Sequence, residues 1–199
     1  MPELAILVPA AGSASRMGGR DKLLEQVGKE PLLRRQARLA LSAHVPVLLT
    51  LPRDRPDRLA ALAGLHGLDI RRIEDAAEGM ATSLRAGAEW ASSLGASGLM
   101  VVLGDMPELR AEDLAKVMQA HHGQPERAWR ATDDTGRAGH PVILPARLFE
   151  QIARLRGDDG ARALLATEDC GHVPLPGRRA TTDLDTPRQW AEWRAGRTP

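Results

Sequence analysis

The sequence predicts an α/β fold built around a mostly parallel central sheet. Two unbroken apolar runs, residues 4–8 and 99–103, have the continuous hydrophobicity of strands that are buried on both faces. Helical patterns with one apolar face alternate with strand patterns along the chain, which is the order that βαβ units produce. A loop of small residues follows the first run, in the position where such a fold usually presents its ligand.

Size and composition restrict the classes of partner. With 199 residues, 43% of them hydrophobic, the chain is long enough to bury a sizeable core, and we expect a single domain over residues 1–199. A net charge of +1 argues against nucleic acid and membrane surfaces as partners. The single cysteine, Cys170, excludes an internal disulfide framework and a thiolate metal cage. No signal peptide and no apolar run of about 20 residues is recognisable, so we expect a cytoplasmic protein.

Periodicity and turn residues predict the other elements in chain order. The first half should contain a helix from Pro31 to His44, a strand at 45–50, a charged surface turn at 52–57 with a short helix after it, an alternating strand at 68–73 and a helix beginning near Met80. The second half should contain a helix over 110–121, a hairpin of strands 128–132 and 141–144 with Gly139 and His140 at its joint, a helix from Phe149 closed by Gly157, a short helix after 158–160, a strand at 172–175 and a helix after Pro187.

The loop after the first strand has the composition of a phosphate site. Gly12, Gly18 and Gly19 allow main-chain N–H groups to approach an anion closely, and Arg16 and Lys22 add positive charge. The spacing does not fit a P-loop, because Lys22 lies four residues after Gly18 with no hydroxyl residue following it, and the dinucleotide fingerprint is absent. The alternative is that the glycines only form turns and the two cations are solvated.

Further candidate residues follow other predicted elements. Asp105 comes directly after the second buried run, held between Gly104 and Pro107, where a carboxylate can bind a metal or cap a helix. Asp185 precedes Thr-Pro and can likewise cap the last helix. Ser83 lies in the first turn of its helix, where it can receive a phosphate or a base edge or simply begin the helix. His140 is either structural or a donor to a second substrate.

Six motifs in register extend this pattern over nearly the whole chain. They are Ala10-Ala11-Gly12 with Arg16-Met17-Gly18 and Lys22-Leu23-Leu24, Gly79-Met80 with Ser83-Leu84 and Gly87, Gly104-Asp105-Met106-Pro107, Gly139-His140-Pro141, Gly157-Asp158 with Gly160-Ala161-Arg162, and Asp183-Leu184-Asp185-Thr186-Pro187. In these motifs the chain resembles the molybdenum cofactor cytidylyltransferases. This resemblance implies a Rossmann-like, three-layer α/β/α nucleotidyltransferase fold with a mostly parallel sheet and a small antiparallel hairpin.

The resemblance also implies roles for individual residues. Arg16, Lys22 and Asp105 would be catalytic, and Asp105 and Asp185 would hold Mg²⁺, or alternatively Mn²⁺, with Asp183 as a substitute for the second carboxylate. The acceptor would contact Gly139, His140, Pro141 and Asp183. The nucleotide would contact Pro9, Ala10, Ala11, Gly12, Ser13, Ser15, Arg16, Met17, Gly18, Lys22, Thr50, Gly79, Met80, Ser83 and Gly104.

The reaction implied is transfer of CMP from CTP to the terminal phosphate of molybdopterin or the molybdenum cofactor, with release of pyrophosphate. The preference for CTP comes from Ala10-Ala11, where guanylyltransferases of this fold typically have paired glycines. Gly19-Arg20-Asp21-Lys22 resembles those guanylyltransferases, and Pro9 resembles the cytidylyltransferases of isoprenoid synthesis. GTP as donor, another phosphorylated acceptor such as a sugar phosphate, and a nucleotide-binding chaperone that delivers the cofactor therefore stay open. A molybdoenzyme or its chaperone is the expected protein partner.

Overall fold

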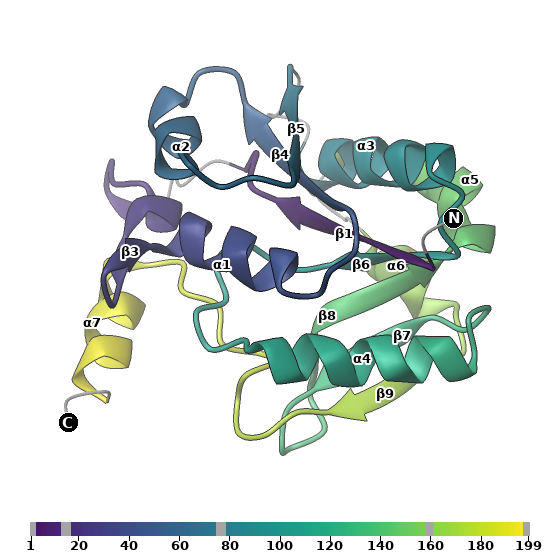
Figure 1. The fold of residues 1–199 in the computed structure, drawn as a ribbon. Coiled ribbons are helices and arrows are strands. Elements are labelled where there is room, and N and C mark those ends of the chain that lie inside the picture. The colour runs from purple at the N-terminus through teal and green to yellow at the C-terminus, as the bar shows by residue number, and fades with distance from the viewer. Residues whose placement is uncertain (1–2, 13–16, 75–78, 158–160, 197–199) are drawn as a thin grey trace.

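A seven-stranded mixed sheet forms the centre of the computed structural model, which describes residues 3–12, 17–74, 79–157 and 161–196 (Figure 1). The strands lie in the order β5-β4-β1-β6-β8-β7-β9. Their bounds are β1 Leu4–Pro9, β4 Val47–Pro52, β5 Leu68–Ile73, β6 Gly98–Val101, β7 Trp129–Thr132, β8 Ala138–Pro145 and β9 Gly171–Pro174. A separate two-stranded antiparallel sheet joins β2 (Gln26–Val27) to β3 (Glu30–Pro31). The predicted α/β fold class is confirmed.

The parallel half of the sheet contains the two apolar runs. Strand β1 pairs in parallel with β4 on one side and with β6 on the other, and β5 adds a fourth parallel strand at the edge. Every residue of β1, β4 and β6 is buried. The edge strand β5 is fully buried only at Ile73, and Ile70, which the alternating pattern would bury, is 41% exposed. The carboxyl ends of β1, β4 and β6 consequently lie at one edge of the sheet.

The antiparallel part differs from the prediction at one point. Strand β8 runs antiparallel to both β6 and β7, and β9 pairs in parallel with β7. Gly139 and His140 lie inside β8, and the turn is formed instead by residues 133–137, where Gly136 has φ +79°. The predicted hairpin is therefore correct and its predicted joint is wrong, because the Asp133 carboxylate closes the turn by accepting hydrogen bonds from the Thr135 and Arg137 backbone N–H groups.

Helices cover both faces of the sheet. Helices α1 (Leu32–Leu41), α2 (Pro56–Ala61) and α4 (Ala111–Gly123) pack on one face, and α3 (Met80–Ser93), α5 (Phe149–Ile152) and α6 (Arg162–Ala166) pack on the other. The described residues also include the 3₁₀ helices η2 (Lys22–Leu24) and η4 (Ala146–Leu148) and the C-terminal α7 (Pro187–Ala195). Figure 1 shows α7 next to β3 and the start of α1, away from β9. The helix predicted to run to Gly157 ends at Ile152, and 158–160 lie outside the described residues.

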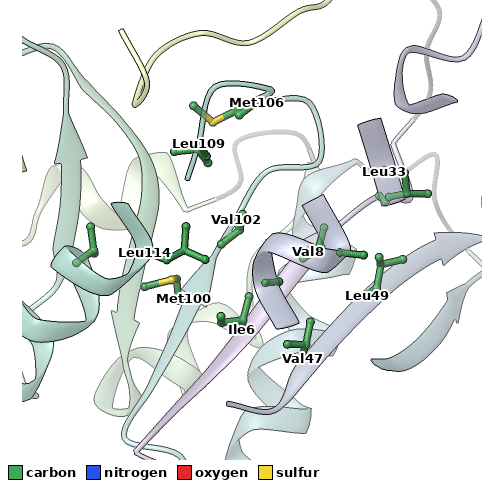
Figure 2. Packing of buried hydrophobic residues seen from close by; sticks show 14 of the residues in the cluster. Ile6, Val8, Leu33, Val47, Leu49, Met100, Val102, Met106, Leu109 and Leu114 are labelled. Carbon is green, nitrogen blue, oxygen red and sulfur yellow. The ribbon is translucent and has the colours of Figure 1, made fainter. Parts of the chain in front are cut away.

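The core divides along the pleat of β1. Ile6 and Val8 face the α1 and α4 side, where Figure 2 shows them among Val47, Leu49, Met100 and Val102 of the neighbouring strand segments. Ala5 and Leu7 face the α3 side. Gly87 of α3 permits a close approach there, because a Cβ at that position would lie 2.7 Å from Leu7 Cδ2. Both faces of β1 are thus fixed, and with them the point where the following loop leaves the sheet.

Candidate functional site

An ammonium group and two carboxylates from three distant parts of the chain meet at the carboxyl edge of the sheet. Lys22 Nζ lies 2.6 Å from Asp105 Oδ2 and 2.6 Å from Asp185 Oδ1. All three side chains are partly buried, at 16–18% exposure. Asp183 is exposed. Of the two C-terminal carboxylates that the sequence offered, Asp185 is the one that lies beside Asp105 and Lys22.

The position of Lys22 follows from local structure at the end of the early loop. Asp21 is the N-cap of η2, and its carboxylate accepts a hydrogen bond of 3.0 Å from the Leu23 backbone N–H. The Leu23 side chain is buried in the main core and contacts the backbone at Gly104, where an added Cβ would lie 3.2 Å from Leu23 Cδ2. Lys22 therefore lies between Asp21, which caps η2, and Leu23, which is buried in the core, next to the segment that carries Asp105.

The turn that carries Asp105 is fixed by helix α1. The fully buried amide of Gln36 donates to the Met106 carbonyl at 2.6 Å, and Arg35 Nε donates to the Pro107 carbonyl at 3.2 Å. Met106 packs into the core (Figure 2). The carbonyl of Asp105 itself accepts the Leu184 N–H at 3.2 Å, which links this turn directly to the segment that carries Asp185.

A capping box places Asp185 at the start of α7. Thr186 is the N-cap, rather than Asp185, and its hydroxyl accepts the Gln189 N–H. The Gln189 side-chain carbonyl accepts N–H groups from Thr186 at 2.9 Å and from Asp185 at 3.0 Å. Since the cap is satisfied in this way, the Asp185 carboxylate is directed to Lys22.

The electrostatics favour a charged cluster. Burial lowers the pKa of Lys22, but the charges and hydrogen bonds of Asp105 and Asp185 outweigh it, so the pKa lies above its usual value of 10.5. Asp105 Oδ1 is buried and has no hydrogen-bond partner within the described ranges. A buried carboxylate oxygen without a donor has the chemistry of a ligand for a hard cation.

The number of acidic ligands also bears on metal chemistry. Within the part of the chain that the structure describes, no group of three or more His, Cys, Asp or Glu side chains is placed to hold a metal ion. Two carboxylates are the donor set typical of Mg²⁺, which usually keeps waters and takes further oxygens from substrate phosphates. Asp105 and Asp185 therefore fit such an ion when the phosphates of a nucleotide complete the ligand set.

The predicted nucleotide residues of the early loop follow β1, and nucleotide contact by them stays a prediction. Pro9 ends β1, and Ala10 and Ala11 are buried, with Ala11 packed against Ile73 and Ala86. Gly12 is exposed, as is Gly18, which has φ +60°. Ser13, Ser15 and Arg16 lie outside the described residues.

Met17 belongs to a hydrophobic cluster that the sequence did not reveal. This residue, predicted to touch the nucleotide, is 1% exposed and packs with Leu32, Leu184 and Trp190. Trp190 of α7 is also 1% exposed, and Trp193 meets it edge-on with ring centroids 5.8 Å apart. The C-terminal helix thus supports both the end of the early loop and the residue preceding Asp185.

Other predicted nucleotide residues lie at the β4 and α3 side. Thr50 and Ser83 are buried, and their hydroxyl oxygens lie 3.0 Å apart, so the pair joins the end of β4 to the first turn of α3. Gly79 precedes α3 with φ +79°, and Met80 packs against the core of that side. Thr50 and Ser83 have an internal role, and nucleotide contact by these four residues stays a prediction.

The predicted acceptor residues lie in and around β8. A Cβ at Gly139 would lie 1.8 Å from the Ala180 carbonyl oxygen, and the His140 N–H donates to that same oxygen at 2.8 Å. The His140–Pro141 peptide bond is cis. Burial lowers the pKa of His140 to about 4, against opposing effects of a hydrogen bond with the Val101 backbone and of the Asp105 charge. His140 is therefore neutral near pH 7, and acceptor contact by this group and by Asp183 stays a prediction.

Arg58 is the buried residue that the sequence analysis missed. It follows the charged turn 52–57, which is exposed at most positions, as predicted, yet the Arg58 side chain is 1% exposed. Its guanidinium reaches the Asp21 carboxylate and the backbone of the early loop. Its partners are far away in sequence, so no helical or strand spacing indicates the contact.

Comparison with known proteins identifies the family. The model of the MobA-like NTP transferase domain matches residues 6–173. The chain belongs to this family. It is a nucleotidyltransferase of the MobA-like type. Among the described residues, no helix has the length and apolarity required to span a membrane.

Individual MobA-like relatives are similar over almost their full length. The purine catabolism protein PucB of Bacillus subtilis is 26% identical over 95% of each chain. A molybdenum cofactor guanylyltransferase of Cereibacter sphaeroides is 27% identical over 93% of this chain and 92% of its own. The crystal structure of Rv0371c from Mycobacterium tuberculosis has a TM-score of 0.80 with 25% identity over 96% of both chains. That protein has also been solved as a manganese complex, with a TM-score of 0.75 and 24% identity over 96% of this chain and 97% of that one.

Proposed function

We propose that this MobA-like transferase transfers CMP from CTP to the terminal phosphate of molybdopterin or the molybdenum cofactor. The observation that carries the proposal is the convergence of Asp105, Asp185 and Lys22 beside the glycine-containing loop at the carboxyl edge of β1 and β6. Ligands of open α/β sheets bind at that edge. A molybdoenzyme or its chaperone as a protein partner stays a prediction.

The chemistry needs positioning and charge neutralisation rather than a covalent enzyme intermediate. An oxygen of the acceptor phosphate attacks the α-phosphorus of the nucleotide in line, the bond from that phosphorus to the bridging oxygen breaks, and pyrophosphate leaves. Asp105 and Asp185 would hold Mg²⁺ or Mn²⁺, which when bound neutralises charge on phosphate oxygens. Lys22 would donate from its ammonium group to the triphosphate, and Arg16 and the loop amides would bind the same phosphates.

Lys22 has to exchange partners in this proposal. Its ammonium group neutralises the two carboxylates in the described arrangement, at 2.6 Å from each. Asp105 and Asp185 would hold a divalent cation, whose charge would repel the ammonium group, so that Lys22 could turn to the triphosphate. One flexible side chain can make this change because the four-carbon stem of lysine carries a compact charge.

The choice of CTP rests on the resemblance of Ala10-Ala11 to the cytidylyltransferases. Both methyl groups are buried, at 1% and 4% exposure, so any influence on base selection would act through the position of the loop backbone rather than by direct contact. GTP is the second candidate donor. It is favoured by the relative named molybdenum cofactor guanylyltransferase and by Gly19-Arg20-Asp21-Lys22.

An assay of pyrophosphate release decides between these donors. The protein is incubated with molybdenum cofactor, Mg²⁺ and each of the four NTPs in turn, and we expect turnover chiefly with CTP. Greater turnover with GTP would establish the guanylyl alternative. Turnover only with a sugar phosphate as acceptor would replace the cofactor as substrate. No pyrophosphate from any combination would refute nucleotidyl transfer by this chain.

Two matched variants assign that turnover to the proposed site. Asp105→Asn keeps the size of the side chain and removes the charge, and it should abolish nearly all activity. Glu150→Gln makes the same change on an exposed side chain of α5 and should leave activity unchanged. Circular dichroism of both variants checks that they are folded. Equal activity of Asp105→Asn and wild type would show that the carboxylate has no role in the reaction.

A further inference from the structure

The guanidinium of Arg58 joins the beginning of the early loop to its end. Arg58 Nη1 donates to the Ala10 carbonyl at 2.5 Å and to the Gly12 carbonyl at 2.9 Å. On its other side Arg58 Nε donates to Asp21 Oδ2 at 2.6 Å, and Nη2 donates to Asp21 Oδ1 at 3.1 Å. One side chain from α2 therefore joins Ala10 and Gly12, which follow β1, to Asp21, which precedes η2.

The hydrogen bonds of Arg58 fix the geometry of their partners in addition to pairing its charge. A buried arginine is unfavourable unless its donors are paired, and here the bidentate contact with Asp21 and the two carbonyls pair each nitrogen of the guanidinium. The Arg58 and Asp21 side chains are 1% and 5% exposed. The fixed fork of the guanidinium sets the directions of all four bonds, which the single ammonium group of a lysine cannot do.

Two consequences for the phosphate site follow from the geometry. Asp21 is both the partner of Arg58 and the N-cap of η2, so the contact fixes the turn that carries Lys22. In a trans peptide the C=O and the next N–H point in opposite directions. Because the Ala10 carbonyl points to Arg58, the Ala11 N–H points away from it, which leaves this donor on the other side of the loop.

We propose that Arg58 is a positioning residue that holds the backbone of Ala10 and Gly12 and, through Asp21, Lys22 in the arrangement that binds the triphosphate. This inference rests on the proposed function, because it assumes that the loop binds phosphates. An arrangement fixed before binding reduces the ordering entropy that the ligand would otherwise have to offset. Arg58 acts through the loop and through Asp21, without contact with the substrate.

A matched control lies one helical turn away. Arg55 also approaches Asp21, with Nη1 3.6 Å from Oδ2, but its side chain is 41% exposed. Within the described residues, the side-chain contacts to the Ala10 and Gly12 carbonyls come from Arg58 and not from Arg55. Arg55→Lys therefore alters charge geometry at the same carboxylate without releasing the loop.

The test measures binding of inorganic tripolyphosphate by calorimetry, which is independent of the base and of the acceptor. We expect Arg58→Lys and Asp21→Asn each to weaken binding by about tenfold or more, as loss of an orienting partner does. The double variant should lose no more affinity than the single variant that binds tripolyphosphate more weakly, because both changes break the same Arg58–Asp21 contact. Arg55→Lys should change the affinity by less than about twofold.

A second control separates positioning from simple loss of stability. Ile152→Val removes one methylene from a fully buried side chain of α5, which lowers the stability of the fold without touching the loop. It should bind tripolyphosphate as wild type does. An equal loss of affinity in Ile152→Val and Arg58→Lys would reduce Arg58 to a stabilising residue and overturn the inference.

The remaining outcomes are also decisive. If wild type binds tripolyphosphate and the folded Arg58→Lys variant binds it equally well, the inference on Arg58 is wrong and the proposed function stands. If wild type does not bind tripolyphosphate, the phosphate site itself is refuted, and the inference fails with it. If Arg58→Lys does not fold, Asp21→Asn gives the same comparison from the other partner of the bond.

Discussion

Trp190 offers the sharpest prediction about how α7 supports the site. The side chain is 1% exposed and packs against Met17, Leu32 and Leu184, while Arg194 lies over its ring at 4.8 Å. A tryptophan buries about 200 Å², and at about 25 cal/mol per Å² this amounts to about 5 kcal/mol as an upper estimate. Measured substitutions of this kind cost about 3–5 kcal/mol. We therefore expect Trp190→Ala to lower the free energy of unfolding by about 4 kcal/mol.

Trp193 is the control for that substitution. It lies one turn later in the same helix, is only partly buried, and donates its indole N–H to Glu108 at 3.0 Å. Trp193→Ala should cost about 1–2 kcal/mol, the range for one hydrogen bond and partial burial. Urea denaturation followed by circular dichroism gives both values. A cost for Trp190→Ala no larger than that for Trp193→Ala would refute the view that Trp190 is the packing centre of this end of the molecule.

Two further predictions concern β8. Gly139→Ala should lower the free energy of unfolding by about 3 kcal/mol or more, because its Cβ would lie 1.8 Å from the Ala180 carbonyl oxygen. Gly123→Ala, whose Cβ would have nothing within 4 Å, should be neutral or stabilising. Equal melting temperatures of the two variants would contradict this. His140 has a pKa of about 4 in the fold and about 6.5 when unfolded, so the unfolded chain binds the extra proton first, and stability should fall by up to about 3 kcal/mol as the pH drops from 6.5 to 4. His140→Gln should remove that part of the pH dependence of the urea midpoint, and an unchanged slope would show that His140 is not the group responsible.

The sequence was informative where a local pattern alone determines the position of an element in the sheet. The runs 4–8 and 99–103 have no polar interruption, and they form the central parallel strands β1 and β6. A carboxylate directly after such a strand lies at the carboxyl edge of the sheet, which is why the position of Asp105 could be predicted, while its role stays a prediction. Asp185 could be placed beside it only through the resemblance, since nothing in residues 183–187 distinguishes a helix cap from a cation ligand.

Tertiary contacts explain what the sequence did not predict. Trp190 packs against Met17 and Leu32, which lie more than a hundred residues earlier, and Arg58 binds Asp21 at the end of the early loop. Neither periodicity nor capping rules contain information about such contacts. Gly139 looked like a turn residue because glycine usually marks turns. Its actual role is to let the Ala180 backbone approach β8, a requirement that only the folded chain reveals.

The central claim is that Asp105 and Asp185 together bind one divalent cation next to Lys22. Titration of Mn²⁺ in the presence of tripolyphosphate, followed by electron paramagnetic resonance, measures this binding without turnover. The account predicts that Asp105→Asn and Asp185→Asn each weaken Mn²⁺ binding by about tenfold or more, or about 1.4 kcal/mol, while Glu150→Gln leaves it unchanged. Mn²⁺ bound equally tightly by wild type and by both Asn variants would contradict the account.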